Sequence, residues 1–172
     1  MKGNCDGYVA DLNDRAQDTQ FARDRMTATD LVFLESLPIT EHLEVAVGRS
    51  VLICHANPQN LEDPLGPDMD EANIRPLLSG VDAEIVAFGH VHVPYVRQLP
   101  PWTLVDVASV GLPRDGDRRS VYAVMTWDRG QWSIEHHRVE YDWDAVARDF
   151  ATVGFPDADT AAATLLGARY QW

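Results

Sequence analysis

The chain has 172 residues, and 27 acidic against 14 basic side chains give it a formal net charge of −13. This acidity disfavours long nucleic acids and anionic membrane surfaces as partners, because both attract clusters of Lys and Arg. No apolar run approaches the ~20 residues that span a bilayer, and no apolar segment typical of a signal peptide follows Met1. The two cysteines, Cys5 and Cys54, form no C-x-x-C pair. We therefore expect a reduced, cytoplasmic protein with one domain over residues 1–172.

Predicted helices and strands alternate along the chain, which favours an α/β fold. Residues 8–25 have a weak helical tendency, and Thr29 is the expected N-cap of a helix that Pro38 ends. Runs of branched apolar residues predict buried strands. These are expected at residues 51–54, 84–88 and 103–107, after a shorter strand at 44–47. Further helices are expected at 70–78, 143–150 and 157–167, and a hairpin at 120–127 and 132–139.

Histidines follow two of the predicted strands. His55 comes directly after one apolar run, and His90 and His92 follow the next within Gly-His-Val-His. Ligand sites in open α/β sheets lie beyond the carboxyl ends of strands, and alternate residues of an extended chain face the same way. We therefore expect the three imidazoles to converge, and imidazole suits several first-row metal ions. The alternative is that each histidine is a hydrogen-bonded structural residue.

Other polar residues carry a weaker signal. The segment Gly3-Asn4-Cys5-Asp6 is typical of a turn in a loop, although the carbonyl oxygen of Asn4 is also a legitimate metal ligand. His136 and His137 lie in the predicted hairpin and are expected to be structural or exposed, and no role is expected of His42.

Taken in order, the motifs resemble those of the calcineurin-like metallophosphoesterase superfamily. That family has G-N-H-D/E, then a strand that ends in H, then G-H-x-H. The matching segments are Gly3-Asn4-Cys5-Asp6, the strand that ends at His55, and Gly89-His90-Val91-His92. The stretch Ser109-Val110-Gly111-Leu112-Pro113-Arg114-Asp115-Gly116-Asp117 resembles the family's small bacterial phosphodiesterase-like branch. The resemblance runs from Gly3 to the region of Gly167.

The resemblance implies a two-layer β-sheet sandwich flanked by helices, with a metal centre at the strand ends. Asn4, His55 and His90 would ligate one ion and His92 a second, so at most two divalent transition ions are expected. Mn²⁺ is the first candidate, with Fe, Zn and Ni as alternatives. Asn4 and His90 would also be catalytic. Four further residues would lie behind the ligands or contact the substrate: Cys5, Asp6, Ser109 and Arg114.

Two features depart from the family pattern. Cys5 stands where the family has its catalytic imidazole, and a thiol with an unperturbed pKa of about 8.5 is a poor substitute for a protonated imidazole. The family's earlier D-x-H and G-D motifs, which supply a bridging carboxylate, have no counterpart before Gly3. We therefore expect an N-terminally truncated domain, the C-terminal two-thirds of the usual one, which lacks about 50–60 residues at ordinary element lengths.

These observations lead to one functional prediction and one alternative. The prediction is a metal-dependent phosphoesterase that hydrolyses small phosphodiesters or phosphomonoesters with a metal-activated hydroxide. The alternative is a catalytically impaired homologue that serves as a metal-binding or protein-interaction scaffold. The expected partner is a small phosphate ester, with no long nucleic acid and no membrane, and unpaired strand edges would favour a homo-oligomer.

Overall fold

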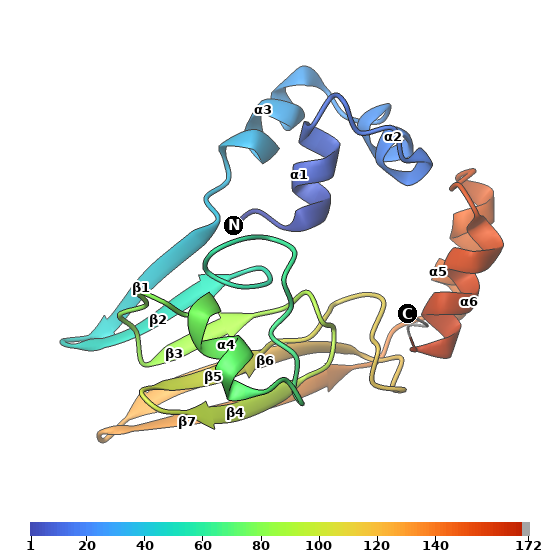
Figure 1. The fold of residues 1–172 in the computed structure, drawn as a ribbon. Coiled ribbons are helices and arrows are strands. Elements are labelled where there is room, and N and C mark those ends of the chain that lie inside the picture. The colour runs from blue at the N-terminus through green and yellow to red at the C-terminus, as the bar shows by residue number, and fades with distance from the viewer. Residues whose placement is uncertain (170–172) are drawn as a thin grey trace.

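The computed structural model describes residues 1–169 of the chain. Figure 1 shows the strands stacked in one layered body, with the first three helices above it and the last two beside it. None of the helices in residues 1–169 is long and apolar enough to cross a membrane. In chain order the elements are α1 (Asn4–Ala10), α2 (Gln17–Arg23), α3 (Ala28–Ser36), β1 (Thr40–Ala46), β2 (Arg49–Cys54), α4 (Glu71–Leu77), β3 (Ile85–Phe88), β4 (Tyr95–Leu99), β5 (Trp102–Asp106), β6 (Ser120–Asp128), β7 (Gln131–Val139), α5 (Trp143–Thr152) and α6 (Ala158–Gly167).

The main sheet has five strands in the order β1-β2-β3-β5-β4. Strands β2, β3 and β5 run parallel, whereas the edge strands β1 and β4 are antiparallel to their neighbours. Every residue of β3 is buried, as expected for a parallel strand that is covered on both faces. The predictions of buried strands at 51–54, 84–88 and 103–107 are confirmed. Because these strands are parallel, their carboxyl ends lie along one edge of the sheet.

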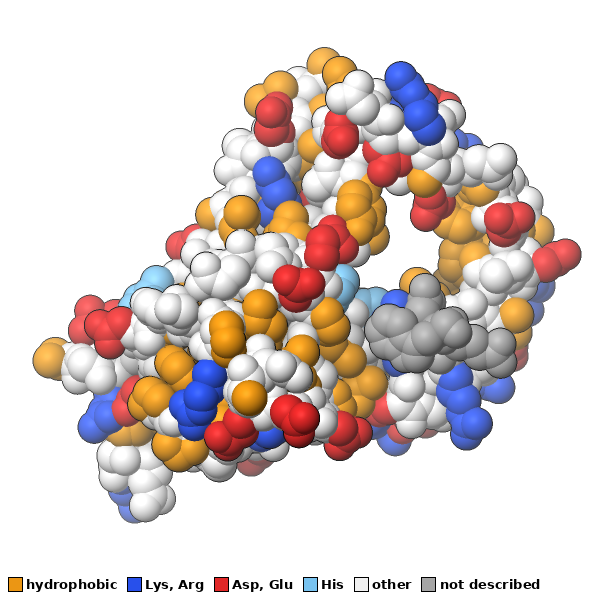
Figure 2. Space-filling model, viewed as in Figure 1, with side chains coloured by type: hydrophobic (Ala, Val, Ile, Leu, Met, Phe, Trp, Pro, Cys, Tyr) orange, Lys and Arg blue, Asp and Glu red, His pale blue; other side chains and the backbone are white. Residues whose placement is uncertain are grey.

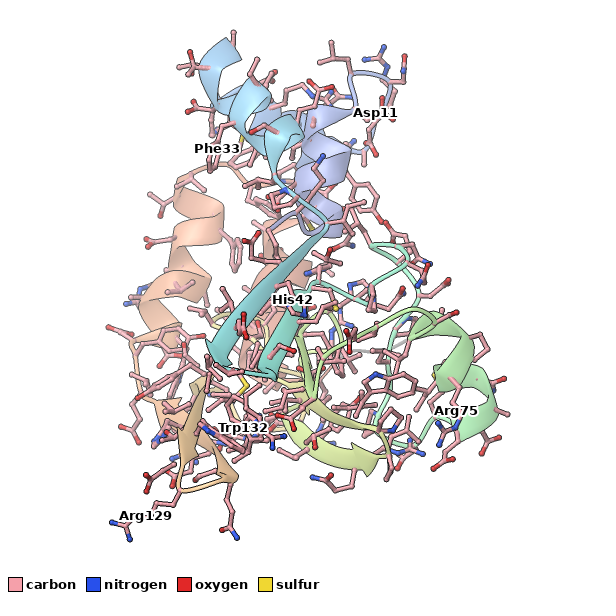
Figure 3. All side chains as sticks on the ribbon, turned by 90° about the vertical axis from the view of Figure 1, so that its left-hand side faces the viewer. Asp11, Phe33, His42, Arg75, Arg129 and Trp132 are labelled. Carbon is pink, nitrogen blue, oxygen red and sulfur yellow. The ribbon has the colours of Figure 1, made fainter. Side chains whose placement is uncertain are left out.

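The second layer is the hairpin of β6 and β7, which pair along their whole length. Met125, Trp132 and Ile134 pack against buried residues of the main sheet, including Ile85 and Val105. Figure 3 shows Arg129 at the tip of this hairpin, pointing away from the body of the protein. The packing of one sheet on the other, with helices around them, confirms the predicted sandwich.

The opposite face of the main sheet is covered by α4 and by the loop that precedes it. Phe88 and Leu104 of the sheet form one cluster with Ile74, Leu78 and Leu65, and all five side chains are buried. This cluster fixes the loop that follows His55 against the sheet. The helix predicted at 70–78 is confirmed as α4.

The N-terminal helices differ from the sequence expectation. The segment Gly3-Asn4-Cys5-Asp6 is no loop turn, because Gly3 caps α1 and the other three residues form its first turn. Helix α3 is capped by Thr27 and not by Thr29: the Thr27 hydroxyl accepts the Asp30 N–H, and the Asp30 carboxylate accepts the Thr27 N–H. This reciprocal pair is a capping box.

The edge strands also differ from the sequence expectation. β1 begins at Thr40, before the predicted residues 44–47, and most of its side chains are exposed. β4 is not predicted from the sequence, because the polar residues Arg97 and Gln98 interrupt its apolar pattern. An edge strand lacks the continuous apolar run that marks a buried one.

The C-terminal helices α5 and α6 confirm the helices predicted at 143–150 and 157–167. The turn between them contacts helix α2, where the ring centroids of Phe21 and Phe155 are 5.1 Å apart. Nearby, Arg25 donates a hydrogen bond of 3.2 Å to the backbone oxygen of Val153. Figure 1 shows the end of α2 close to the upper end of α5 and α6, at the right of the view.

Asp106 is a buried carboxyl at the end of β5. Its Oδ1 accepts the Ala108 N–H at 2.6 Å, while Oδ2 is buried and has no hydrogen-bond partner among residues 1–169. Burial raises the pKa of Asp106 to about 8. The unfolded carboxyl titrates at about 4, so the folded state holds an extra proton between these two values. Stability therefore falls as the pH rises through this window.

We predict that Asp106→Asn removes this pH dependence. The amide keeps the acceptor for Ala108 and carries no charge, so the variant should be more stable than the wild type at pH 8 by on the order of a few kcal/mol. The gain should shrink as the pH falls towards 4. Urea unfolding across this range measures it, with the exposed Asp128→Asn as the control. A difference that is the same at every pH would contradict the prediction.

Candidate metal centre

The parallel strands bring His55 and His90 together. β2 ends at Cys54 and β3 at Phe88, so the two histidines follow neighbouring strands at the same edge of the sheet. The backbone oxygen of His55 accepts the Gly89 N–H at 2.9 Å, which holds the two segments side by side. His90 Nδ1 lies 3.1 Å from His55 Nε2.

The Gly-His-Val-His segment is not an extension of β3. His90 and His92 both have left-handed backbone conformations, with φ of 66° and 62°. The expectation that alternation along an extended chain aims both rings at one point is therefore wrong. Non-glycine residues adopt this conformation at a cost and need support from their surroundings. Here hydrogen bonds to both rings supply that support.

Those hydrogen bonds also set the tautomers of the two rings. His90 Nε2 lies 3.0 Å from the backbone oxygen of Glu62, and His92 Nδ1 lies 2.8 Å from that of Leu112. A carbonyl oxygen only accepts, so each of these nitrogens carries the proton. His90 Nδ1 and His92 Nε2 keep their lone pairs. A histidine that ligates a metal commonly donates its other N–H in this way.

Helix α1 presents Asn4 to the same point. Asn4 Oδ1 lies 2.8 Å from His55 Nε2. The Asp6 carboxylate accepts the Gly3 N–H at 2.7 Å and so caps the helix that carries Asn4. A Cβ atom at Gly3 would lie 3.3 Å from His55 Nδ1, so glycine permits this close approach.

A hydrogen-bonded chain behind Asn4 orients its amide. Asn4 Nδ2 donates to Tyr8 Oη at 3.5 Å, and Tyr8 donates to the Glu62 carboxylate at 2.7 Å. The sequence reasoning missed both Tyr8 and Glu62. The spacing from Asn4 to Tyr8 would have placed them on one helix face, had the helix been predicted. No signal in the sequence joins Tyr8 to Glu62.

Burial and like charges shape the electrostatics of the cluster. Burial, then the neighbouring His90 and His92, lower the pKa of His55. Burial also lowers the pKa of His92. Both rings therefore favour the neutral form that a metal requires. Burial raises the pKa of the Cys5 thiol, and acidic neighbours raise it further, Asp6 most among them.

Ser109 and Arg114 both reach this region. Ser109 lines a cavity of about 310 Å³ together with His55, His90 and His92. The Arg114 N–H donates to the backbone oxygen of His92 at 3.1 Å. Figure 2 shows histidine side chains at the lower rim of the opening between the N-terminal and C-terminal helices, close to acidic side chains.

The remaining histidines lie elsewhere, as expected. His136 Nε2 lies 2.7 Å from the backbone oxygen of Asp106, and His137 stacks on Tyr122. His42 is exposed on β1 and contacts the backbone oxygen of Asp82. Figure 3 shows His42 on the face of β1 that is turned to the viewer.

The cluster fits a first-row transition ion by geometry and by donor type. His55 Nε2 lies 2.8 Å from Asn4 Oδ1 and 3.1 Å from His90 Nδ1. Ligands at neighbouring positions around an ion with bonds of ~2.1 Å lie ~3 Å apart. Within residues 1–169, no group of three or more His, Cys, Asp and Glu side chains is arranged to hold a metal. His55, His90 and His92 therefore do not form such a group by themselves in this part of the chain, and a set of three ligands here would need the amide of Asn4.

The fold is an α/β sandwich, and two histidines at the carboxyl ends of its parallel strands lie against Asn4 of helix α1. The chain belongs to the calcineurin-like phosphoesterase superfamily, because the family model described as "Calcineurin-like phosphoesterase superfamily domain" matches residues 1–130. The matched range contains the four residues Asn4, His55, His90 and His92. The family resemblance drawn from the sequence is therefore confirmed.

The chain is also similar to individual known proteins, and each match covers a different share of the two chains. An uncharacterised protein of Methanocaldococcus jannaschii is 30% identical, and the match covers 66% of this chain and 50% of that protein. The chain thus spans half the length of this curated relative. Two solved structures share the fold. A metallophosphoesterase from Sphaerobacter thermophilus has a TM-score of 0.71 and 22% identity, with 96% of this chain and 75% of that chain covered. A hypothetical protein from Pyrococcus horikoshii has a TM-score of 0.71 and 16% identity, with 95% and 71% covered.

We predict that Asp6→Ala destabilises the protein by ~1 kcal/mol, because α1 loses its capping carboxylate. Asp24→Ala, an exposed aspartate beyond the end of α2, should change the free energy of unfolding by less than about 0.5 kcal/mol. Urea unfolding of both variants measures the difference. Equal effects of the two substitutions would show that Asp6 does not support α1.

Proposed function

We propose that this protein is a metal-dependent phosphoesterase that hydrolyses small phosphodiesters or phosphomonoesters. One observation carries the proposal: donor atoms of Asn4, His55 and His90 converge at the strand ends of a calcineurin-like phosphoesterase domain. The strongly acidic chain favours a small substrate over a long nucleic acid. A cytoplasmic location is part of the same proposal.

The proposed donor set assigns a role to each polar residue of the cluster. Asn4, His55 and His90 hold one divalent ion, with Mn²⁺ the first candidate, and His92 serves a second. A bound ion supplies Lewis-acid polarisation of a phosphoryl oxygen and lowers the pKa of water to give a nucleophile at neutral pH. The protein contributes the orientation of the donors: the carbonyl of Glu62 fixes His90 in the tautomer that leaves Nδ1 unprotonated.

The chemistry of Cys5 points to substrates with good leaving groups. General acid catalysis works best when the donor's pKa lies near the working pH, and the pKa of the Cys5 thiol is raised above its ordinary value. A leaving group that departs as a stabilised anion, such as an aryl oxide, needs no such proton. We therefore include in the proposal that aryl esters and diesters react faster than alkyl monoesters.

We predict that the wild type hydrolyses bis-p-nitrophenyl phosphate in the presence of Mn²⁺ and that His90→Ala lowers the rate by 100-fold or more, since a ligand and its orientation are lost together. Removal of only the hydrogen-bond partner of a metal ligand costs roughly 10–100-fold, so loss of the ligand itself should reach at least the upper end of that range. The control is His42→Ala, whose ring is exposed on β1. Release of p-nitrophenolate measures the rate, and calorimetric titration with Mn²⁺ measures binding.

Two results would contradict the proposal. Equal rates for the wild type and for His90→Ala would remove the site from the reaction. A wild type that takes up no Mn²⁺, Zn²⁺ or Ni²⁺ on titration would remove the metal, and would leave the scaffold alternative as the better description.

We predict further that Tyr8→Phe weakens Mn²⁺ binding by ~10-fold, because Asn4 loses the hydroxyl that orients its amide. Tyr122→Phe is the matched control, since Tyr122 lies in β6 and stacks on His137. Calorimetric titration gives both dissociation constants. If Tyr8→Phe binds Mn²⁺ as tightly as Tyr122→Phe, the orienting role of Tyr8 is wrong.

A further inference from the structure

A second cavity adjoins the histidine segment. Its volume is about 320 Å³, close to the lower end of the range for small-molecule sites, about 300–1,000 Å³. Val91 and Val93, which alternate with His90 and His92, form one wall. The loop that follows His55 forms the other. The residues of that loop which line the cavity are Pro64, Gly66, Pro67, Asp68 and Met69.

The loop wall of this cavity is held in place by side chains of β4. Arg97 donates to the backbone oxygens of Pro67 and Met69, at 3.2 and 2.6 Å. Tyr95 donates to the backbone oxygen of Leu65 at 2.6 Å, and Leu65 itself is fully buried. The cavity is therefore preformed, so a ligand pays little to order it.

Arg114 connects the cavity to the histidine cluster. Arg114 lines the cavity, and its backbone N–H donates to the backbone oxygen of His92 at 3.1 Å. Its charge is among the causes that lower the pKa of His92. The loop that carries it is fixed to β7, because Arg138 pairs with Asp115 and lies 3.3 Å from Asp117. Arg114 thus brings a cation to the junction between an apolar cavity and the cluster.

We propose that this cavity binds the organic group of the substrate, and that this group is apolar and at least as large as one aromatic ring. Arg114 contacts the phosphoryl group at the mouth of the cavity, while Val91, Val93 and Met69 contact the organic group. The carboxylate of Asp68 repels a second anionic group, which disfavours nucleoside polyphosphates. This inference rests on the proposed function, because it names the substrate class of the same site.

Binding of two phosphonates to the Mn²⁺-loaded protein tests the inference without turnover. Phenylphosphonate and methylphosphonate share the anionic group and differ in the apolar part. Burial of the ring should make phenylphosphonate bind ~10-fold more tightly, within the range that small apolar groups contribute in such pockets. Isothermal calorimetry gives both dissociation constants in the same buffer.

Variants locate the effect in this cavity. Met69→Gln and Val93→Thr each place a polar atom in the wall at little change in volume, and both should reduce the preference for phenylphosphonate. Met26→Gln, an exposed methionine outside the cavity, should leave it unchanged. Arg114→Gln should weaken both phosphonates alike, whereas Arg118→Gln in the same loop should weaken neither. Circular dichroism confirms that each variant is folded.

Failure of this inference is distinguishable from failure of the proposed function. Equal affinities of the wild type for the two phosphonates, or binding of neither, would overturn the inference, even where bis-p-nitrophenyl phosphate is hydrolysed. A preference that survives in both Met69→Gln and Val93→Thr would also overturn it. A preference lost in these variants supports the cavity assignment even where no hydrolysis is seen, and in that case the proposed reaction is what fails.

Discussion

The contact between Asn4 Oδ1 and His55 Nε2, at 2.8 Å, couples the N-terminal helices to the ends of the parallel strands. Asn4 lies in the first turn of α1, so the position of its carbonyl depends on how that helix begins. The Lys2 N–H also donates to the backbone oxygen of Pro38 at 2.8 Å, which ties the chain ahead of α1 to the segment that enters β1. Any movement at the start of α1 therefore displaces Asn4 relative to His55.

The negative charge near the cluster is carried by the carboxylates of Asp6 and Glu62, not by the converging atoms. The converging atoms are imidazole nitrogens and an amide oxygen, which carry no net charge. Asp6 and Glu62 stand close enough that their carboxylates act to raise the pKa of His55, against the larger effect of burial. The same two residues make the hydrogen bonds that cap α1 and hold Tyr8. At the proposed site their charge would favour a bound cation, while their hydrogen bonds cap α1 and hold Tyr8.

The central strands and the histidines after them could be predicted from the sequence, because buried parallel strands are marked by continuous branched apolar runs. His55 and His90 follow such runs, and parallel topology then brings them together. Other parts of the site could not be predicted. Gly3-Asn4-Cys5-Asp6 suits a turn as well as a helix start, and the left-handed conformations of His90 and His92 leave no mark on residue type. The contact of Tyr8 with Glu62 joins residues 54 positions apart in the chain.

Under the proposed function, a chain with a formal net charge of −13 must bind a negatively charged phosphate ester. Salt screens exposed charges beyond a Debye length of about 8 Å at physiological ionic strength, so the distant carboxylates count for less than the groups at the site. Arg114 is one such group, and the ion pairs of Arg138 hold its loop against β7. Affinity for phosphate then depends on where a few cations are placed rather than on the overall field. Under the proposed function, the loop of Arg114 would affect both catalysis and substrate choice, because its backbone contacts His92 and Arg114 lines the apolar cavity.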